Sequence, residues 1–209
     1  MTTLRNVAFL CMASMGCAFG RLPAFTHAGG SSGGMPYGTV LSYFGYLAPG
    51  AEGEGTLDGK PVHCLWLWFP NHVDALGVRM ISPAGSRKPG PGDLTAGDYE
   101  ANALSKASFD PWFRFERCAS ALNPEDLKDA CTQWIALGTG NGQRGSAEVS
   151  LVADQADIQK ALTRGMYRVS YAAQSGTGEG TFLLQLGTGE ALQGFAVATS
   201  QKELARQVE

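Results

Sequence analysis

The sequence contains the residue types that hydrolases and metalloenzymes use, but their spacing does not assemble a recognisable site. Its three histidines, His27, His63 and His72, form no i,i+4 pair and have no acid at ligand spacing. We therefore expect one flexible, one packed and one solvated histidine. The remaining enzyme hypothesis is a hydrolase assembled from distant residues such as Asp110, Glu116 and His63. Because no nucleophile motif stands in its proper context, the sequence predicts no enzyme and no catalytic residue.

Two glycine-rich segments match catalytic or nucleotide-binding spellings in the wrong structural context. Residues 140–145, GNGQRG, match the dinucleotide-binding pattern, but they follow a predicted helix and precede a predicted strand. Residues 30–34, GSSGG, match a nucleophile elbow but lie in a segment too polar to fold. We interpret the first segment as a loop and the second as a chance match.

The first residues of the chain have the layout of a secretion signal. Arg5 precedes an apolar run over residues 7–15, and small residues follow it. The run is shorter than the ~20 residues that a membrane-spanning helix needs. We therefore predict a signal peptide over residues 1–16.

Cys17 is the residue for which the sequence predicts covalent chemistry. Ser14-Met15-Gly16-Cys17 has the form of a bacterial lipobox, in which the cysteine is acylated before cleavage, although Ser14 replaces the usual Leu. Several acyl chains, such as palmitate, anchor a protein stably to a bilayer. We therefore predict lipidation of Cys17. An ordinary secreted protein, cut between Gly16 and His27, is the alternative.

Three cysteines remain in the predicted exported part of the chain. Cys118 and Cys131 are close in sequence and could form a disulfide, with Cys64 buried on a strand. Three reduced cysteines in the core are the equally weighted alternative. The sequence contains no Cys-x-x-Cys spacing, so it disfavours a zinc or thioredoxin-type site.

Composition and charge favour one turn-rich domain. The chain has 209 residues, 28 of them Gly, and a formal net charge of −3. It contains no run of Lys or Arg that could follow a phosphate backbone, so we expect no nucleic-acid partner. Residues 17–36 are rich in Gly and Ser and predict a flexible tether after the lipidated cysteine. Residues 37–209 then form the globular domain.

Aromatic and β-branched runs separated by Gly and Pro predict a mostly β domain. Alternation, as in Tyr167/Val169/Tyr171, is typical of half-buried antiparallel strands, and the run over 62–69 is apolar on both faces, as a central strand should be. We predict a jelly-roll β-sandwich, with a small barrel as the alternative. Strands are expected near residues 38–47, 62–69, 77–82, 111–118, 146–152, 166–173, 181–187 and 194–199.

Three short peripheral helices are also predicted. Asn123-Pro124-Glu125 has the form of a helix start, and Leu127, Cys131, Trp134 and Ile135 follow at helical spacing. A second helix is expected from Asp154 to a stop at Gly165. A third is expected after Ser200, where residues 200–203 spell a capping box.

Several segments, in order and spacing, resemble the family of the major outer-membrane surface lipoprotein of pathogenic leptospires. The resemblance covers nearly the whole chain and implies a lipid-anchored jelly-roll domain on the outer membrane, surface-exposed or periplasm-facing. It also implies calcium binding and adhesion to extracellular-matrix proteins. The similar segments are CAFGRLP at 17–23, PYG at 36–38, YFGY at 43–46, GVRMISP at 77–83, PGPGDL at 89–94, FDPWFRFER at 109–117 and RGMYRVS at 164–170.

The calcium ligands implied by the resemblance are only partly present. Asp110 matches the family's aspartate, but Pro111 stands where the family has a threonine, and the acid-rich loop has no counterpart between Cys131 and Ser146. Calcium prefers six to eight oxygen ligands. Because only one of these carboxylates is retained, we predict at best a weak metal site at Asp110. The sequence predicts no other cofactor.

The sequence thus predicts a lipid-anchored, non-enzymatic surface lipoprotein that binds an extracellular-matrix or envelope macromolecule. A carbohydrate-binding module is the alternative, because Trp66, Trp68 or Trp112 could stack on sugars if they were exposed on one sheet face. Core packing is the expected role of these rings. A lipid-anchored hydrolase is the third hypothesis.

Overall fold

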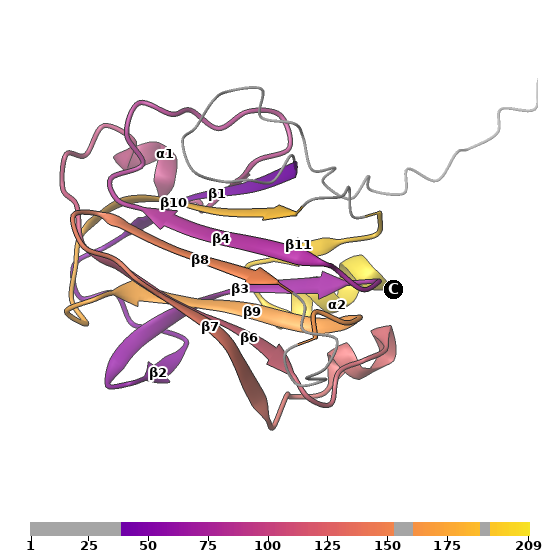
Figure 1. Ribbon diagram of the computed structural model, residues 1–209. Helices are drawn as coiled ribbons and strands as arrows, with labels where there is room; N and C mark the ends of the chain where they lie inside the picture. The colour runs from indigo at the N-terminus through magenta and orange to yellow at the C-terminus, as the bar shows by residue number, and fades with distance from the viewer. Residues whose placement is uncertain (1–38, 153–160, 189–192) are drawn as a thin grey trace, which may run out of the picture.

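The computed structural model describes residues 39–152, 161–188 and 193–209, which fold into two packed β-sheets (Figure 1). One sheet has the strand order β5-β1-β10-β4-β8, comprising β1 (Thr39–Leu47), β4 (Ala75–Ile81), β5 (Leu94–Thr95), β8 (Ser146–Val152) and β10 (Gly180–Thr188). The other has the order β11-β3-β9-β6-β7, comprising β3 (Lys60–Phe69), β6 (Pro111–Cys118), β7 (Trp134–Asn141), β9 (Gly165–Ala173) and β11 (Ala196–Ala198), with β2 (Gly55–Leu57) paired to β3. The helices are α1 (Tyr99–Asn102), the 3-10 turn η1 (Pro124–Lys128) and α2 (Gln201–Val208). The prediction of a mostly β sandwich is confirmed.

The core lies between the two sheets and follows the predicted alternation. Tyr167, Val169 and Tyr171 of β9 point inward, as do Phe182 and Leu184 of β10, and all five are buried in the main apolar cluster. A period of two places alternate side chains on one face of a strand. We call this side of each sheet the inner face and the opposite side the outer face.

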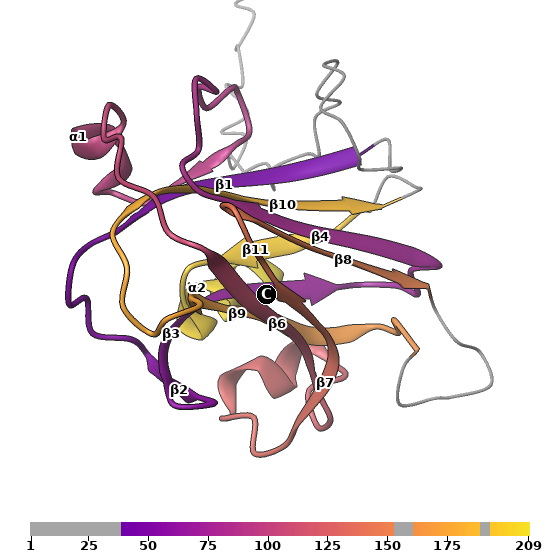
Figure 2. The ribbon, with the colours of Figure 1, turned by 60° about the vertical axis from the view of Figure 1, so that its left-hand side comes forward.

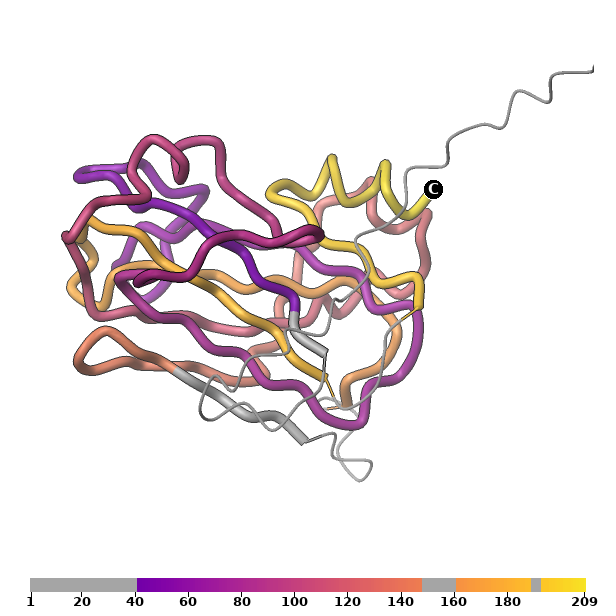
Figure 3. Tube along the Cα trace, turned by 90° about the horizontal axis from the view of Figure 1, so that it is seen from above, coloured from indigo at the N-terminus to yellow at the C-terminus, as the bar shows by residue number. Residues whose placement is uncertain are grey.

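The strand β3 is covered on both faces, as its continuous apolar run predicts. Leu65 and Leu67 point into the core between the sheets. Cys64 and Trp68 lie on the outer face, and Trp68 packs with Leu204 of α2 in a second buried cluster. The C-terminal helix and η1 therefore form a small cap over one end of this sheet, and the tube view shows them side by side (Figure 3).

The C-terminal helix begins where the sequence predicts. Ser200 is its N-cap and accepts a hydrogen bond from the Glu203 backbone N–H at 3.2 Å. The predicted helix after Asn123 is wrong in length, because it ends at Lys128 after one 3-10 turn. The chain then turns back, and Trp134 pairs with Cys118 at the end of β6. Sheet pairing here outweighs the helical spacing of Trp134 and its neighbours.

The strand β7 lies where a helix was predicted before residues 140–145, so this second prediction is wrong. Residues 140–145 do not follow a helix: Gly140 and Asn141 end this strand, and residues 142–145 make the turn from β7 into β8. A side chain at Gly140 would meet the Phe113 ring at 2.2 Å, so the strand needs a glycine there. The turn itself uses positive φ at Arg144 (59°) and Gly145 (78°).

The connections between long strands mostly cross from one sheet to the other. From β3 to β4, β4 to β6, β7 to β8, β8 to β9 and β9 to β10, the chain changes sheet, and only β6 to β7 stays within one sheet (Figure 2). The finer jelly-roll assignment remains a prediction. Within the described residues, no helix is both long enough and apolar enough to cross a membrane. The helix expected between Asp154 and Gly165 lies largely outside these residues, although Gly165 itself begins β9.

Candidate functional site

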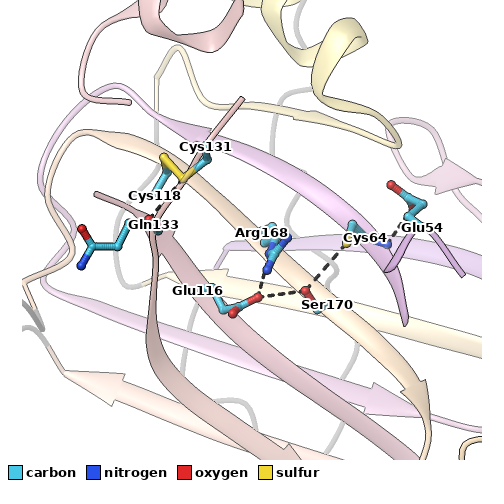
Figure 4. Close-up of polar contacts among 8 residues, drawn as sticks. All are labelled: Glu54, Cys64, Glu116, Cys118, Cys131, Gln133, Arg168 and Ser170. Carbon is cyan, nitrogen blue, oxygen red and sulfur yellow. Dashed lines mark hydrogen bonds and ion pairs between the residues drawn. A yellow bond between two sulfur atoms is a disulfide. The ribbon is translucent and has the colours of Figure 1, made fainter. Parts of the chain in front are cut away.

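A buried polar network lies on the outer face of the sheet that contains β3, β9 and β6 (Figure 4). Glu116 Oε2 accepts hydrogen bonds from Arg168 Nε at 2.7 Å and from Ser170 Oγ at 2.9 Å. Glu116 and Ser170 are buried, and the Arg168 side chain is 17% exposed. The ion pair has a further hydrogen-bond donor and is therefore well satisfied for its depth.

The thiol of Cys64 extends this network. Its Sγ lies 3.7 Å from Ser170 Oγ, and because Ser170 gives its proton to Glu116, the thiol must be the donor of the pair. Burial raises the pKa of Cys64 to about 11, and the charge of Glu54 adds to the rise. A thiol that is protonated at neutral pH is a poor nucleophile. The Cys64 thiol therefore contributes a hydrogen-bond donor to the network at neutral pH, not a thiolate.

The structure does not bring together the three residues of the hydrolase hypothesis. His63 pairs in register with Tyr171 and lies on the inner face, whereas Glu116 lies on the outer face of the same sheet. Asp110 precedes β6 and is six residues from Glu116, or about 20 Å along an extended strand. The loop histidine His72 is bonded to Asp74 at 3.0 Å on the surface. His27 lies outside the described residues.

Asp110 is exposed, and its carboxylate already has a local role. Its Oδ1 accepts a hydrogen bond from the Gly145 backbone N–H at 2.9 Å, which ties the start of β6 to the turn between β7 and β8. The described residues contain no group of three or more His, Cys, Asp or Glu side chains that could hold a metal ion. The residues around Asp110 therefore do not fit calcium's preference for many oxygen ligands.

The structure joins Cys118 and Cys131 in a disulfide, one of the two arrangements considered for them, and leaves Cys64 free and buried. The bond connects the end of β6 to the segment after η1. Gln201 of α2 donates to the carbonyls of Leu127 in η1 and of Asp129 just after it, at 2.9 and 2.7 Å. The disulfide therefore helps to hold the cap over the sheet.

The outer face of this sheet also carries all four tryptophans. Trp68 and Trp112 are buried, whereas Trp66 and Trp134 are partly exposed and meet edge to face with centroids 5.7 Å apart. Arg168 lies 4.0 Å from the Trp134 centroid. We call Trp66, Trp112, Trp134, Arg114 and Arg168 the tryptophan face.

Two cations flank the buried ring of the tryptophan face. Lys60 and Arg114 lie 5.3 and 5.4 Å from the Trp112 centroid, and Arg114 also pairs with Asp58. Sequence reasoning did not single out Arg114 or Arg168. The only available signal was their alternation with apolar neighbours on β6 and β9, which places both on the outer face.

A second feature is a pair of adjoining cavities between the sheets, at the end of the sandwich where β1 ends and β9 turns into β10. Each has a volume of about 160 Å³. We call the two together the end pocket. Both are lined by Leu47, Ala48, Ala51 and His63; one also by Tyr43, Tyr46, Ala96, Asp98, Tyr171 and Phe182, and the other by Gly50, Pro61, Ala173, Gly176, Thr177 and Gly178.

The aromatic side chains of the end pocket support one another. The Tyr43 and Phe182 centroids are 5.7 Å apart, those of Tyr171 and Phe182 are 5.0 Å apart, and those of His63 and Tyr171 are 5.7 Å apart. Burial raises the pKa of Tyr43 and Tyr171 and lowers the pKa of His63. These hydroxyls and the imidazole are therefore uncharged at neutral pH.

Cys17, the signal peptide and the tether predicted over 17–36 lie outside the described residues, so their assignment stays a prediction. No curated protein matches the chain. Among solved structures, the chain is similar to one from the cryo-EM atomic structure of Broad Bean Stain Virus, with 12% identity, 73% of this chain and 94% of that chain covered, and a TM-score of 0.17. That likeness is too low to support a conclusion about the fold.

A protein-family match is more informative, because it covers residues 32–197 and thus most of the chain. The family is Lipl32, described as surface lipoprotein of Spirochaetales order. The match includes β1 to β10 and the first two residues of β11, and therefore covers the strands of both sheets, the tryptophan face and the end pocket. The chain thus belongs to the Lipl32 family of spirochaete surface lipoproteins.

Proposed function

We propose that this chain is a non-enzymatic outer-membrane lipoprotein, anchored through acylated Cys17, whose sandwich binds a macromolecule through the tryptophan face. Membership of a surface lipoprotein family supports the location. The lipobox-like segment over residues 14–17 supports the anchor, because a thiol carrying acyl chains holds a folded domain at a bilayer.

The residue types of the tryptophan face carry the binding proposal. Tryptophan and arginine are the types that most often dominate binding energy at protein interfaces. Trp66 and Trp134 are partly exposed, and the Arg114 side chain is 21% exposed. The ion pair with the buried Glu116 holds Arg168 in place within this face, so the face needs little ordering when a partner binds.

The absence of catalysis is also part of the proposal. Two buried side chains that could supply a base or a nucleophile are in forms that disfavour this role. Glu116 accepts hydrogen bonds from Arg168 and Ser170, and Cys64 is protonated at neutral pH. We expect neither a fluorophosphonate probe nor an iodoacetamide probe to label the folded sandwich. Labelling of Ser170 by the fluorophosphonate at a rate above that of the unfolded chain would contradict this part.

Metabolic labelling with a palmitate analogue tests the anchor. The wild-type chain should incorporate the label and fractionate with membranes, whereas Cys17→Ala should lose both properties. Cys64→Ala is the matched control and should keep them, because Cys64 lies in the folded sandwich. A Cys17→Ala chain that still fractionates with membranes contradicts the anchor.

Charge reversal on the tryptophan face tests the binding proposal. The full chain should bind one or more immobilised extracellular-matrix proteins or isolated envelope material, and Arg114→Glu should weaken this binding at least roughly tenfold. Lys88→Glu is the control, because Lys88 is exposed in the connection between β4 and β5 of the other sheet. Equal binding by both variants would rule out the tryptophan face.

A carbohydrate-binding function remains the second candidate, because Trp66 and Trp134 keep part of their rings exposed on one sheet face. Arg168 occupies one side of the Trp134 ring, which reduces the area for sugar stacking. Binding of the full chain to a polysaccharide panel, with loss in Trp66→Ala and no binding to any protein tested, would favour this candidate.

A further inference from the structure

The end pocket is a cavity that the surface lipoprotein assignment does not use. It opens between the two sheets, away from the network of Glu116, because its lining residues on β3 and β9 point to the inner face. Each cavity, at about 160 Å³, has room for several water molecules. A ligand group of that size would contact both sheets at once.

The charge around the end pocket is negative. Asp98 lines it, and the charges of Asp98 and Glu54 reach inside, because both contribute to the raised pKa of Tyr43 and both act on the pKa of His63. At the rim, Glu179 Oε1 accepts a hydrogen bond from the Tyr46 hydroxyl at 2.8 Å. These carboxylates create a negative potential at a small opening.

No positive side chain balances this potential within the lining. Among the described residues that line the two cavities, none is lysine or arginine. Lys60 precedes the lining residue Pro61, but its ammonium lies over Trp112 on the outer face. Burial lowers the pKa of His63, so its ring adds no charge at neutral pH.

The aromatic lining adds a second preference for a cation. Tyr43, Tyr46, Tyr171 and Phe182 contribute four rings to one cavity. Aromatic rings attract organic cations through their quadrupole, and sites for quaternary ammonium groups combine several such rings with nearby acids. The contacts of Phe182 with Tyr43 and Tyr171 hold the rings in place, so they need no rearrangement on binding.

From the aromatic lining, the carboxylates and the size of the cavity, we propose that the end pocket binds the trimethylammonium group of a small organic cation. Choline-like headgroups have this chemistry. An anion is disfavoured by Asp98, Glu54 and Glu179. This site is separate from the tryptophan face, so its failure would leave the proposed partner binding unaffected.

Calorimetric titration of the full chain in a maltoside detergent with choline chloride tests this site. We expect a dissociation constant of about 1 mM or tighter. The probe 3,3-dimethyl-1-butanol has the same shape without the charge and should bind at least roughly tenfold more weakly. No binding of choline, or equal binding of the two probes, would overturn the proposal.

Two pairs of variants assign the binding to this pocket. Asp98→Asn should weaken choline binding at least roughly threefold, whereas Glu100→Gln, two residues away and exposed, should leave it unchanged. Tyr46→Phe keeps the ring and should bind as the wild type, whereas Tyr46→Leu should bind more weakly. All three positions are at least partly exposed, so the four variants should fold, and a thermal melt of each checks this. Wild-type affinity in both Asp98→Asn and Tyr46→Leu would overturn the assignment.

Glycerophosphocholine distinguishes the two sources of the headgroup. Tighter binding of this molecule than of choline would indicate a lipid headgroup as the ligand, and tighter binding of choline would indicate a free amine. Either order supports a trimethylammonium site, provided that the uncharged isostere binds more weakly than both.

Discussion

Arg168 of β9 and Glu116 of β6 face each other across neighbouring strands, with Nε 2.7 Å from Oε2 on the outer face of the sheet. The carboxylate is buried, and Ser170 satisfies it further. Removing one partner of such a pair leaves a buried charge without compensation, which typically costs about 3–5 kcal/mol. The pair therefore constrains the register of β6 and β9 at the tryptophan face.

Glu116→Gln should lower the free energy of unfolding by about 3 kcal/mol, because Arg168 would keep its charge and lose its partner. Denaturant unfolding followed by tryptophan fluorescence measures this change. Glu125→Gln removes an exposed carboxylate on η1 and should change stability by less than about 0.5 kcal/mol. A loss below about 1 kcal/mol for Glu116→Gln would show that the network contributes little.

Cys64 should react slowly with thiol reagents in the folded protein. With a pKa of about 11, only about one thiol in a thousand is ionised at pH 8, against about one in ten at the ordinary value of 9.0. Timed reaction with Ellman's reagent measures this. Unfolding in denaturant should raise the reaction rate of Cys64 by more than about a hundredfold. Cys64→Ser should abolish the slow reaction seen in the folded protein. A rate that is the same in folded and unfolded protein contradicts the placement of this thiol.

Stability should fall as the pH rises above about 9. The pKa of Cys64 is raised from 9.0 to about 11 in the folded state, so between these values the folded chain retains a proton that the unfolded chain has lost. Stability then decreases by up to about 1.4 kcal/mol per pH unit for this one group. Above pH 10, Tyr167, whose pKa burial raises to about 12, adds to the loss in the same direction.

Unfolding titrations between pH 7 and 11 check this dependence. Cys64 should contribute almost no pH dependence to the free energy of unfolding below pH 8. Above pH 9, its contribution should make the free energy of unfolding fall as the pH rises. Cys64→Ala should reduce the slope between about pH 9 and 9.5, where most tyrosines are still protonated in both states because their ordinary pKa is about 10. An unchanged slope in Cys64→Ala would assign the pH dependence to other groups.

Calcium should bind the full chain no more tightly than about 1 mM, because Asp110 brings one carboxylate that already caps the Gly145 N–H. Calorimetric titration with calcium chloride measures this constant. Asp110→Asn should then behave as the wild type toward calcium. A micromolar constant that Asp110→Asn abolishes would show that this position does hold the ion.

The alternation of side chains along single strands could be predicted from the sequence. Most core residues could therefore be predicted as well. The run over 111–118 corresponds to β6, and the inward side of Tyr171 follows from a period of two. The strand β7 was missed because Trp134 and Ile135 also fit a helical period and because Gly138 and Gly140 lower strand propensity. Two short strands, β2 and β5, carry too few residues for any period to show.

The contacts that build the sites depend on register between strands distant in sequence. Glu116 and Arg168 are 52 residues apart, and nothing in either strand's own pattern selects the other as its partner. Likewise, Tyr43 and Asp98 approach one pocket from different elements. The disulfide of Cys118 and Cys131 was within reach of sequence reasoning because its partners are only 13 residues apart.

The last helix lies over an indole ring that would otherwise face water. Leu204 of α2 packs with Trp68, and at the other end of the helix Glu209 forms a 2.7 Å ion pair with Lys128. Removal of α2 would therefore expose the buried Trp68 ring and the apolar residues around it, and the resulting apolar surface should promote aggregation.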